Sequence, residues 1–445
     1  MTKDKFHKKI GFISLGCDKN RVDLEKMITI LSAYEEFEFV GDKSEADVII
    51  VNTCAFLQSA RDEAQRIILE MAKLKKTASL KKLIVTGCLA VLENKKLMEK
   101  IPEIDAVVLR EDYNKIDDII FGLFNEEFSR IDEDGARKLT TPRHFAYLKI
   151  ADGCNNRCAY CKIPFIRGNY KSVPMIELVQ EASLLCEKGV KEIILVAQDV
   201  TRFGCETNGQ ENLVKLLKEL EKIKKLSWIR LLYCYPDLVT DELIKEIKDS
   251  AKVINYIDIP FQHVSDKVLK NMCRRETKKD IISLITKLRR EMSDIKIRST
   301  FMVGFPGETE KDFKELCDFL KEYKLDNVGF FKYSREEGTA SFDMNCQISE
   351  KDKDKRLRIV QKIQEKIATE KNLSLVGQTF KVLCDSYDKK HEFYVGRSYF
   401  CAPDIDFEIL FTSKREILIG SFVDVEIVDY DKGYFIGKTE KFATY

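Results

Sequence analysis

The sequence predicts an α/β protein in three parts: an N-terminal open parallel α/β domain, a central (β/α)6 partial TIM barrel, and a small all-β barrel at the C-terminus. Three observations support this prediction. The chain of 445 residues is about three times the usual length of one domain. Short apolar runs alternate with helical patterns over most of the chain, which is typical of parallel sheets. After one long charged helix, the pattern changes to short alternating strands separated by turns.

The first domain is expected over residues 1–125. Its predicted strands and amphipathic helices alternate: strands at 8–17, 46–54, 81–88 and 105–110, and helices at 21–34 and 58–76. A polar stretch over 126–145 contains a Gly and a Pro and has no clear period, so it is predicted to be a linker.

The central barrel is expected over residues 146–375. Six strands are predicted, at 147–151, 192–198, 228–235, 256–263, 296–305 and 328–334. In such barrels the chemistry lies at the C-terminal ends of the strands. The terminal barrel is expected over 376–445, with predicted strands at 379–387, 392–399, 424–430 and 433–440.

Composition excludes several classes of protein. Lys and Arg number 75 against 74 Asp and Glu, a net charge of +1, which argues against a protein that mainly grips a polyanion. No apolar run approaches the ~18 residues that cross a bilayer, and the N-terminus reads as a strand rather than a signal peptide, so we expect a cytosolic protein. Fourteen cysteines then stand against four histidines. In a reducing compartment, cysteines that lie together are expected to hold a metal or do chemistry.

The most specific motif is AYLKIADGCNNRCAYCKIPFIRG, in which Cys154, Cys158 and Cys161 form CxxxCxxC after the first barrel strand. Three thiolates on one loop can ligate three irons of a 4Fe-4S cluster and leave the fourth iron open. A zinc knuckle is the alternative, but zinc sites usually draw four ligands from two paired clusters, and no second CxxC exists. A two-cluster ferredoxin would continue with Cys-Pro, where Lys162 and Ile163 stand.

A second set of cysteines is spread over the first domain. Cys17, Cys54 and Cys88 each end a predicted strand, in SLGC, VNTC and VTGC. Parallel strands align their C-terminal ends along one edge of a sheet, so we expect the three thiols to converge. Any one of them alone would be a common small core residue. Their equivalent positions predict a second three-cysteine cluster.

At the CxxxCxxC loop the sequence resembles the radical S-adenosylmethionine (SAM) enzymes. The resemblance implies that the cofactor chelates the open iron and is cleaved by one electron to a 5'-deoxyadenosyl radical, which the barrel aims. No residue is assigned as an acid-base catalyst. The cofactor contacts that we expect are Tyr160, Gln198, Asp199, Gln262, His263, Arg298, Ser299 and Gly304.

Two three-cysteine clusters followed by a small barrel resemble the methylthiotransferase family over essentially the whole chain, with the terminal barrel similar to a TRAM domain that recognises the target. The motifs YIDIPFQHVSDKVLKNMCRR, FKYSREEGTASF and VGRSYFCAPDID resemble the RimO-type branch. This branch modifies the β-carbon of an aspartate in the twelfth small-subunit ribosomal protein, giving 3-methylthioaspartate. The resemblance further implies an electron donor such as flavodoxin or ferredoxin and a sulfur donor.

Two other functions remain open from the sequence. One is a transfer-RNA methylthiotransferase that acts on an adenosine next to the anticodon, and the other is an iron-sulfur scaffold without catalysis. Residues 376–445 carry nine Lys and Arg against twelve Asp and Glu, a net charge of −3, which suits a basic protein better than a phosphate backbone. Asp404 and Asp406 are therefore candidates for contacts with a basic target.

Overall fold

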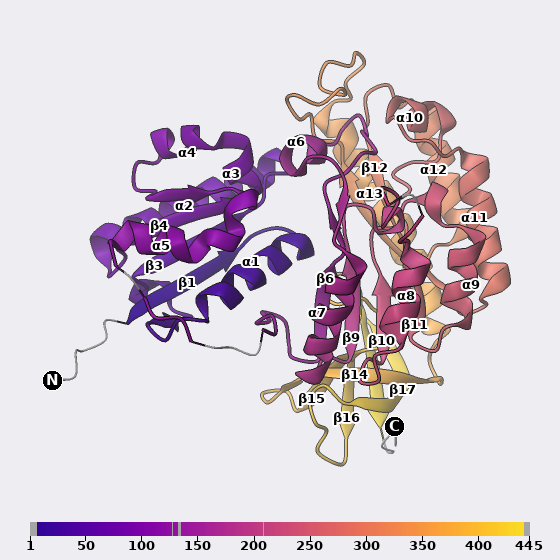
Figure 1. Cartoon of the computed structure of the whole chain (residues 1–445). Coiled ribbons are helices and arrows are strands. Elements are labelled where there is room, and N and C mark those ends of the chain that lie inside the picture. The colour runs from indigo at the N-terminus through magenta and orange to yellow at the C-terminus, as the bar shows by residue number, and fades with distance from the viewer. Residues whose placement is uncertain (1–6, 127, 132–134, 208, 440–445) are drawn as a thin grey trace.

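The computed structural model describes residues 7–126, 128–131, 135–207 and 209–439, and Figure 1 shows its three sheets in sequence along the chain. Parts of the predicted domains lie outside the described residues: 1–6, 127, 132–134, 208 and 440–445. The described part of the predicted linker packs against the N-terminal unit. Phe128 packs against Phe37 and Phe121, and Ile131 N–H donates to Ala33 O at 2.7 Å.

The N-terminal unit is a five-stranded parallel sheet in the order β2-β1-β3-β4-β5. Its strands are β1 Lys8–Ser14, β2 Phe37–Phe39, β3 Val48–Thr53, β4 Lys82–Gly87 and β5 Ala106–Val108. Its helices are α1 Asp18–Leu31, η1 Lys43–Glu45, α2 Gln58–Thr77, α3 Cys88–Glu93, α4 Lys95–Lys100, η2 Arg110–Lys115 and α5 Ile116–Phe124. In β3, Ile49 and Val51 join one core, and Val48 and Ile50 join the core on the opposite face. Burial on both faces explains the continuous apolar run of this strand.

The central unit is a six-stranded parallel sheet in the order β13-β12-β11-β10-β9-β6. Its strands are β6 Phe145–Lys149, β9 Glu192–Val196, β10 Trp228–Leu231, β11 Val253–Asp258, β12 Lys296–Val303 and β13 Asn327–Lys332. The other segments are β7 Ala151–Asp152, α6 Ile163–Arg167, β8 Lys171–Ser172, α7 Met175–Glu187, η3 Val200–Arg202, α8 Leu213–Glu221, η4 Pro236–Leu238, α9 Asp241–Asp249, α10 Asp266–Asn271, α11 Lys278–Glu291, α12 Glu310–Tyr323 and α13 Glu350–Leu373. Strands β6 and β13 do not pair with each other among the described residues, so the barrel is partial.

The C-terminal unit is a closed five-stranded barrel in the order β14-β15-β16-β18-β17. Its strands are β14 Thr379–Asp388, β15 Phe393–Arg397, β16 Glu408–Ser413, β17 Phe422–Asp431 and β18 Tyr434–Thr439. The sequence analysis did not identify β16. Its buried residues Ile409 and Phe411 do alternate with more exposed ones, which is the strand pattern over only six residues.

The C-terminal barrel docks at the N-terminal ends of the central strands through a chain of ion pairs. Glu192 at the start of β9 binds Arg230 and Arg397, each at 2.7 Å. Arg397 also binds Asp385 at 2.7 Å, and Asp385 lies 2.6 Å from His144 Nε2. Each of these buried charged groups therefore has a partner of opposite charge, as burial of ionised side chains requires. One end of the central barrel is thereby closed, and chemistry is left to the other end.

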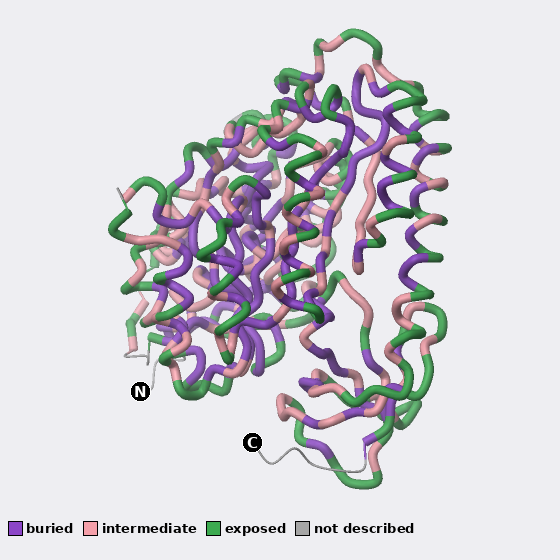
Figure 2. Tube along the Cα trace, turned by 90° about the vertical axis from the view of Figure 1, so that its right-hand side faces the viewer, coloured by how far each residue is buried: buried purple, intermediate pink, exposed green. Residues whose placement is uncertain are grey.

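The distribution of buried residues follows from this arrangement of sheets and helices. Figure 2 shows that the buried segments lie mainly along the strands and on the helix faces turned toward them. Helix α1 of the N-terminal unit packs against β6 and covers that edge of the central sheet. Within the ranges described above, no helix is long and apolar enough to cross a membrane.

Candidate functional site

The loop between β7 and α6 brings Cys154, Cys158 and Cys161 together at the C-terminal end of β6. The loop is closed by hydrogen bonds from Cys154 N–H to Gly168 O at 3.1 Å and from Cys161 N–H to Cys158 O at 3.0 Å. Its first turn requires Gly153, at φ +75°, because a Cβ there would collide with Asn169 O. Burial and the neighbouring thiols of Cys158 and Cys154 raise the pKa of Cys161. The three thiols therefore share one site.

The structure also brings Cys17, Cys54 and Cys88 together, which we call the auxiliary site. Cys17 precedes α1, Cys54 follows β3, and Cys88 begins α3 directly after β4. A Cβ on Gly16 would lie 2.9 Å from Cys54 Cβ, so the first two loops approach closely. Burial raises the pKa of Cys88 to about 11, and the Cys17 and Cys54 thiols raise it further while Arg167 opposes them. The convergence expected from the strand ends is present.

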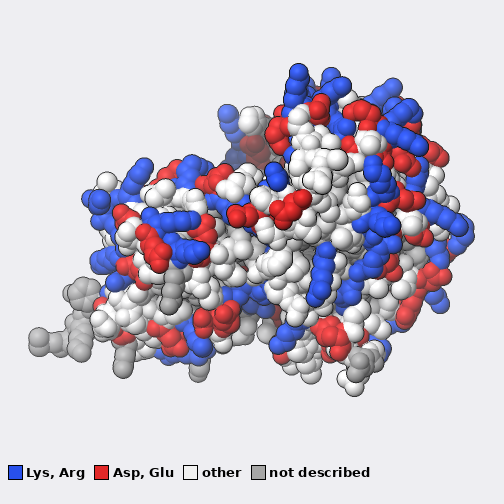
Figure 3. Space-filling model, turned by 90° about the horizontal axis from the view of Figure 1, so that it is seen from above, with Lys and Arg blue, Asp and Glu red and all other residues white. Residues whose placement is uncertain are grey.

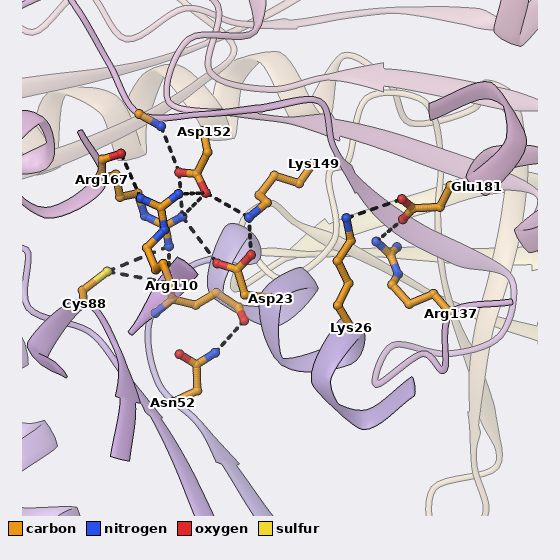
Figure 4. Close-up of polar contacts among 12 residues, drawn as sticks. Asp23, Lys26, Asn52, Cys88, Arg110, Arg137, Lys149, Asp152, Arg167 and Glu181 are labelled. Atoms are coloured by element: carbon orange, nitrogen blue, oxygen red, sulfur yellow. Dashed lines mark hydrogen bonds and ion pairs between the residues drawn. The ribbon is translucent and has the colours of Figure 1, made fainter. Parts of the chain in front are cut away.

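Arg167 joins the two cysteine sites (Figure 4). Its short helix α6 begins two residues after Cys161, and Ile163 N–H donates to Cys161 Sγ at 3.4 Å. At the other end of α6, the Arg167 guanidinium donates to Asn20 Oδ1 and lies 3.9 Å from Cys88 Sγ. Arg167 therefore extends from the barrel into the auxiliary site.

The groups around Arg167 carry an excess of one positive charge. Figure 4 shows Arg167, Arg110 and Lys149 surrounding Asp23 and Asp152. Arg167 contacts Asp152 at 2.9 Å and Asp23 at 3.4 Å, and Arg110 contacts Asp152 at 2.6 Å. Because buried charges need partners, a thiolate at Cys88 would balance this excess. Of the groups around Cys88, Arg167 is therefore the one that favours a ligating thiolate, against the burial that raises the pKa of this thiol.

Both thiol sets fit iron-sulfur clusters in donor type and number. All fourteen cysteines are free thiols. Among the described residues, no three His, Cys, Asp or Glu side chains are arranged to hold a single metal ion. Three thiolates of a 4Fe-4S cluster bind three different irons, so they stand farther apart than the ligands of one ion. The type and number of donors in each set therefore fit a 4Fe-4S cluster.

Several buried polar atoms near the barrel mouth have no hydrogen-bond partner. They include Gln198 Oε1, Gln262 Oε1, His263 Nε2 and Tyr235 Oη. Buried polar atoms are almost always bonded, so such a group needs an explanation. A polar ligand the size of S-adenosylmethionine at the mouth would supply partners for those atoms that face it.

Two further expected contacts lie beside the CxxxCxxC loop. Tyr160 packs near Phe305, with ring centroids 6.4 Å apart, and burial followed by the Cys158 thiol raises its pKa. Asp199 follows β9, is fully buried, and accepts from Asn156 Nδ2 at 2.9 Å and from Thr201 Oγ1 at 2.6 Å. Asp199 therefore anchors the cysteine loop to the end of β9.

The remaining expected contacts lie elsewhere in the central unit. Arg298 sits midway along β12 and binds Asp258 at 2.9 Å and Asp406 at 3.6 Å. The Ser299 hydroxyl donates to Ile259 O at 2.7 Å. His263 Nδ1 accepts from Ser265 N–H at 3.0 Å, and Gly304 packs under Lys353. In the part of the chain that the structure describes, these residues make no hydrogen bond or ion pair with the thiols, and their role toward the cofactor stays a prediction.

The sequence analysis did not single out four residues that line the site: Lys19, Arg167, Tyr233 and Tyr235. Both tyrosines follow β10, so the rule that chemistry lies at strand ends could have identified them. Lys19 and Arg167 are next to the two cysteine motifs in sequence, but nothing in their spacing shows that they point inward.

The loop of the motif CAPDID turns into the central barrel instead of outward. The Asp406 side chain is 2% exposed and accepts from Tyr256 Oη at 2.6 Å. Asp404 is 56% exposed and lies 3.4 Å from Arg21. Of these two acidic residues, only Asp404 is therefore available to a basic target.

Figure 3 shows positive and negative side chains intermixed over the upper face, as the near-zero net charge predicts.

Comparison with protein families divides the chain in the same order. Residues 9–109 match the uncharacterized protein family UPF0004, residues 148–320 match the Radical SAM superfamily, and residues 376–439 match the TRAM domain. The radical SAM enzyme class and the TRAM-like barrel expected from the sequence are confirmed.

Curated relatives match over nearly the whole chain. The "ribosomal protein uS12 methylthiotransferase RimO" of Clostridium botulinum strain Eklund 17B is 49% identical over 435 residues, covering 95% of this chain and 97% of that protein. Its namesake in Acetivibrio thermocellus is 44% identical over 446 residues, covering 97% and 98%. Among solved structures, the radical S-adenosylmethionine methyltransferase TsrM of Kitasatospora setae is similar in fold, with a TM-score of 0.54, 15% identity, and 73% and 72% of the two chains covered.

Proposed function

The chain belongs to the ribosomal protein uS12 methylthiotransferase RimO family, and we propose that it methylthiolates the β-carbon of an aspartate in this twelfth small-subunit protein, giving 3-methylthioaspartate. It is a radical SAM methylthiotransferase that uses S-adenosylmethionine and 4Fe-4S clusters. The observation that carries the proposal is the pair of three-thiol sites joined by α6. In this proposal, the site on the CxxxCxxC loop serves radical formation, and the auxiliary site serves sulfur transfer.

The proposal assigns each group of residues a task. Cys154, Cys158 and Cys161 would hold the radical cluster, and the auxiliary site would hold the second. Bound cofactor and cluster supply a radical that can remove hydrogen from a carbon with no acidic proton, for which acid-base catalysis offers nothing. The chain itself orients the cofactor through its unpartnered rim atoms. It excludes water with an apolar cluster that includes Ala159, Met272, Phe305 and Tyr333.

The proposal also covers partners, location and domain roles. Cofactor cleavage consumes an electron, which calls for a donor such as flavodoxin or ferredoxin, and the inserted sulfur calls for a sulfur donor. We assign the reaction to the cytoplasm, where ribosomal proteins are made. Residues 1–125 would carry the auxiliary cluster, and residues 126–145 would form a linker. Residues 146–375 would form the radical SAM barrel, and residues 376–445 would recognise the target.

Mass spectrometry of cells with and without the gene tests this function. Protein uS12 from wild-type cells should carry a methylthio group on one aspartate, and uS12 from deletion cells should lack it. Bulk transfer RNA from both strains should be identical. Methylthioadenosine that disappears on deletion, with unmodified uS12, would overturn the protein substrate and support the transfer-RNA alternative.

A further inference from the structure

Lys19 is a buried cation beside the auxiliary site. It lies in the first turn of α1, two residues after Cys17, and is 6% exposed. Its Nζ lies 3.4 Å from the centroid of the Tyr233 ring. In the described part of the chain, no carboxylate lies within the 4.0 Å of an ion pair with this Nζ. A cation-π contact alone offsets only part of the cost of burying an ammonium group.

Tyr233, whose ring packs against Lys19, has a strained backbone conformation. Tyr233 has φ +60°, which is uncommon for a residue other than Gly. Its N–H donates to Asp258 Oδ2 at 3.0 Å, and its hydroxyl donates to Asp18 Oδ2 at 3.0 Å. Backbone strain of this kind concentrates at functional sites. The surrounding contacts therefore fix the ring that positions the Lys19 ammonium.

Lys19 also lies between the two cysteine sites. Tyr233 packs against Lys19, which lies two residues after Cys17 of the auxiliary site. Two residues after Tyr233, the Tyr235 ring centroid lies 4.1 Å from the guanidinium carbon of Arg274, and its hydroxyl is buried without a hydrogen-bond partner. Arg274 lies two residues after Met272, whose carbonyl accepts from Ala159 N–H of the radical loop at 3.0 Å. The end of β10 thus extends from one site to the other. Lys19 therefore packs at the strand end that extends between the two sites.

We propose that Lys19 Nζ binds the carboxylate of the target aspartate and holds its β-carbon between the two cysteine sites. The inference deepens the proposed function and rests on it. An ammonium-carboxylate pair satisfies the buried cation and fixes the carbon next to the carboxylate, which is the orientation that the reaction needs. An adenine base offers no carboxylate, so Lys19 is also a determinant of specificity for a protein target.

The test compares Lys19→Met with the wild-type enzyme on two forms of uS12, one with the target Asp and one with Asn there. Lys19→Met keeps the side-chain volume over Tyr233 and removes the charge. We expect the iron content of Lys19→Met to match that of the wild type. Methylthiolation of the Asp form should fall about 100-fold, and the preference for Asp over Asn should disappear. Lys26→Gln, on the same helix and 43% exposed, is the matched control.

An unchanged preference for Asp in an iron-loaded Lys19→Met enzyme would overturn the inference while leaving the proposed function intact. A wild-type enzyme that makes no methylthioaspartate would instead overturn the proposed function. If Lys19→Met does not load iron, the Lys19→Arg variant is used to test the inference instead. A slower enzyme that still prefers Asp supports the inference, because the charge is kept, and equal rates on Asp and Asn overturn it.

Discussion

The two cysteine sites are built in opposite ways. The radical site takes its three thiols from one loop, Cys154 to Cys161, inside one domain. The auxiliary site takes one thiol from each of three strand ends, and it borrows Arg167 from the neighbouring domain. The Arg167 guanidinium lies 3.9 Å from Cys88 Sγ. In the described part of the chain, Ile163 N–H donates to Cys161 Sγ at 3.4 Å, and Arg202 and Arg274 act on the Cys154 and Cys158 thiols only through longer-range charge interaction.

This difference predicts how each site responds to change. A site made by one loop needs only local turns, so it should tolerate weakened contacts between domains. A site assembled from three strands and a second domain depends on how the two domains dock. Its electronic properties should also follow the Arg167 charge, because hydrogen bonds to cluster sulfurs set reduction potential.

The largest expected effect comes from removing each thiol set completely. Anaerobically reconstituted enzyme should hold about eight irons, as two 4Fe-4S clusters require. Changing Cys154, Cys158 and Cys161 to Ala should halve the iron and abolish cofactor cleavage. Changing Cys17, Cys54 and Cys88 to Ala should halve the iron and leave cleavage uncoupled from methylthiolation. Iron analysis and 5'-deoxyadenosine assays distinguish the two, and full iron in either triple variant would refute that ligand set.

The free energy of unfolding should depend on pH through Glu308, which lies near the radical site. Glu308 lies in the turn that carries Phe305 against Tyr160, and burial raises its pKa from 4.5 to about 7, although Arg356 at 3.3 Å opposes this. Between these two values the unfolded chain releases the proton and the folded chain keeps it. Stability should therefore fall as pH rises through this window, by at most about 3 kcal/mol.

Glu308→Gln provides the control for this pH effect. The variant cannot ionise at this position, so its denaturation midpoint should change less than that of the wild type between pH 4.5 and 7. Urea denaturation of both apo proteins at several pH values gives the comparison. Parallel curves for the two proteins would show that Glu308 does not titrate in this window.

A smaller effect is expected from the Arg167 charge. Arg167→Gln should disfavour the reduced auxiliary cluster about tenfold, a shift of 59 mV to more negative potential for one electron. Redox titration followed by EPR, in the variant that lacks the radical thiols, isolates the auxiliary cluster. Arg137→Gln, which breaks the ion pairs of the linker residue Arg137 with Glu25 at 3.2 Å and Glu181 at 2.5 Å, should leave the potential unchanged. An unchanged potential in Arg167→Gln would remove the distinction between the sites.

The smallest effect is expected at Asp404, which is 56% exposed and lies 3.4 Å from Arg21 of α1. Asp404 has φ +65°, a conformation that Asp adopts more readily than Lys, so Asp404→Lys should lower stability by about 1 kcal/mol and leave both clusters intact. Modification of uS12 should become slower and less sensitive to salt, because charge complementarity mainly sets the rate of encounter. Stopped assays at two ionic strengths measure this, and an unchanged salt dependence would exclude Asp404 from target recognition.

The sequence revealed what is local or periodic and missed what depends on packing between domains. CxxxCxxC identifies its site directly, and parallel strand ends were enough to bring Cys17, Cys54 and Cys88 together. Counting charges could not show that Asp406 is buried against Arg298, because that contact joins residues from two domains. The opposite orientations of Arg298 and Ser299 follow from strand alternation, which a period of two could have indicated.

The position of Arg167 has a consequence for biosynthesis. A nascent chain that has reached residue 126 contains all three thiols of the auxiliary site, but Lys149, Asp152 and Arg167 have yet to be made. Domains generally fold from the N-terminus as synthesis proceeds. The first domain therefore emerges with its metal-binding edge uncovered and without the cation that favours a thiolate at Cys88. We therefore expect the auxiliary site to load iron only once the second domain is complete.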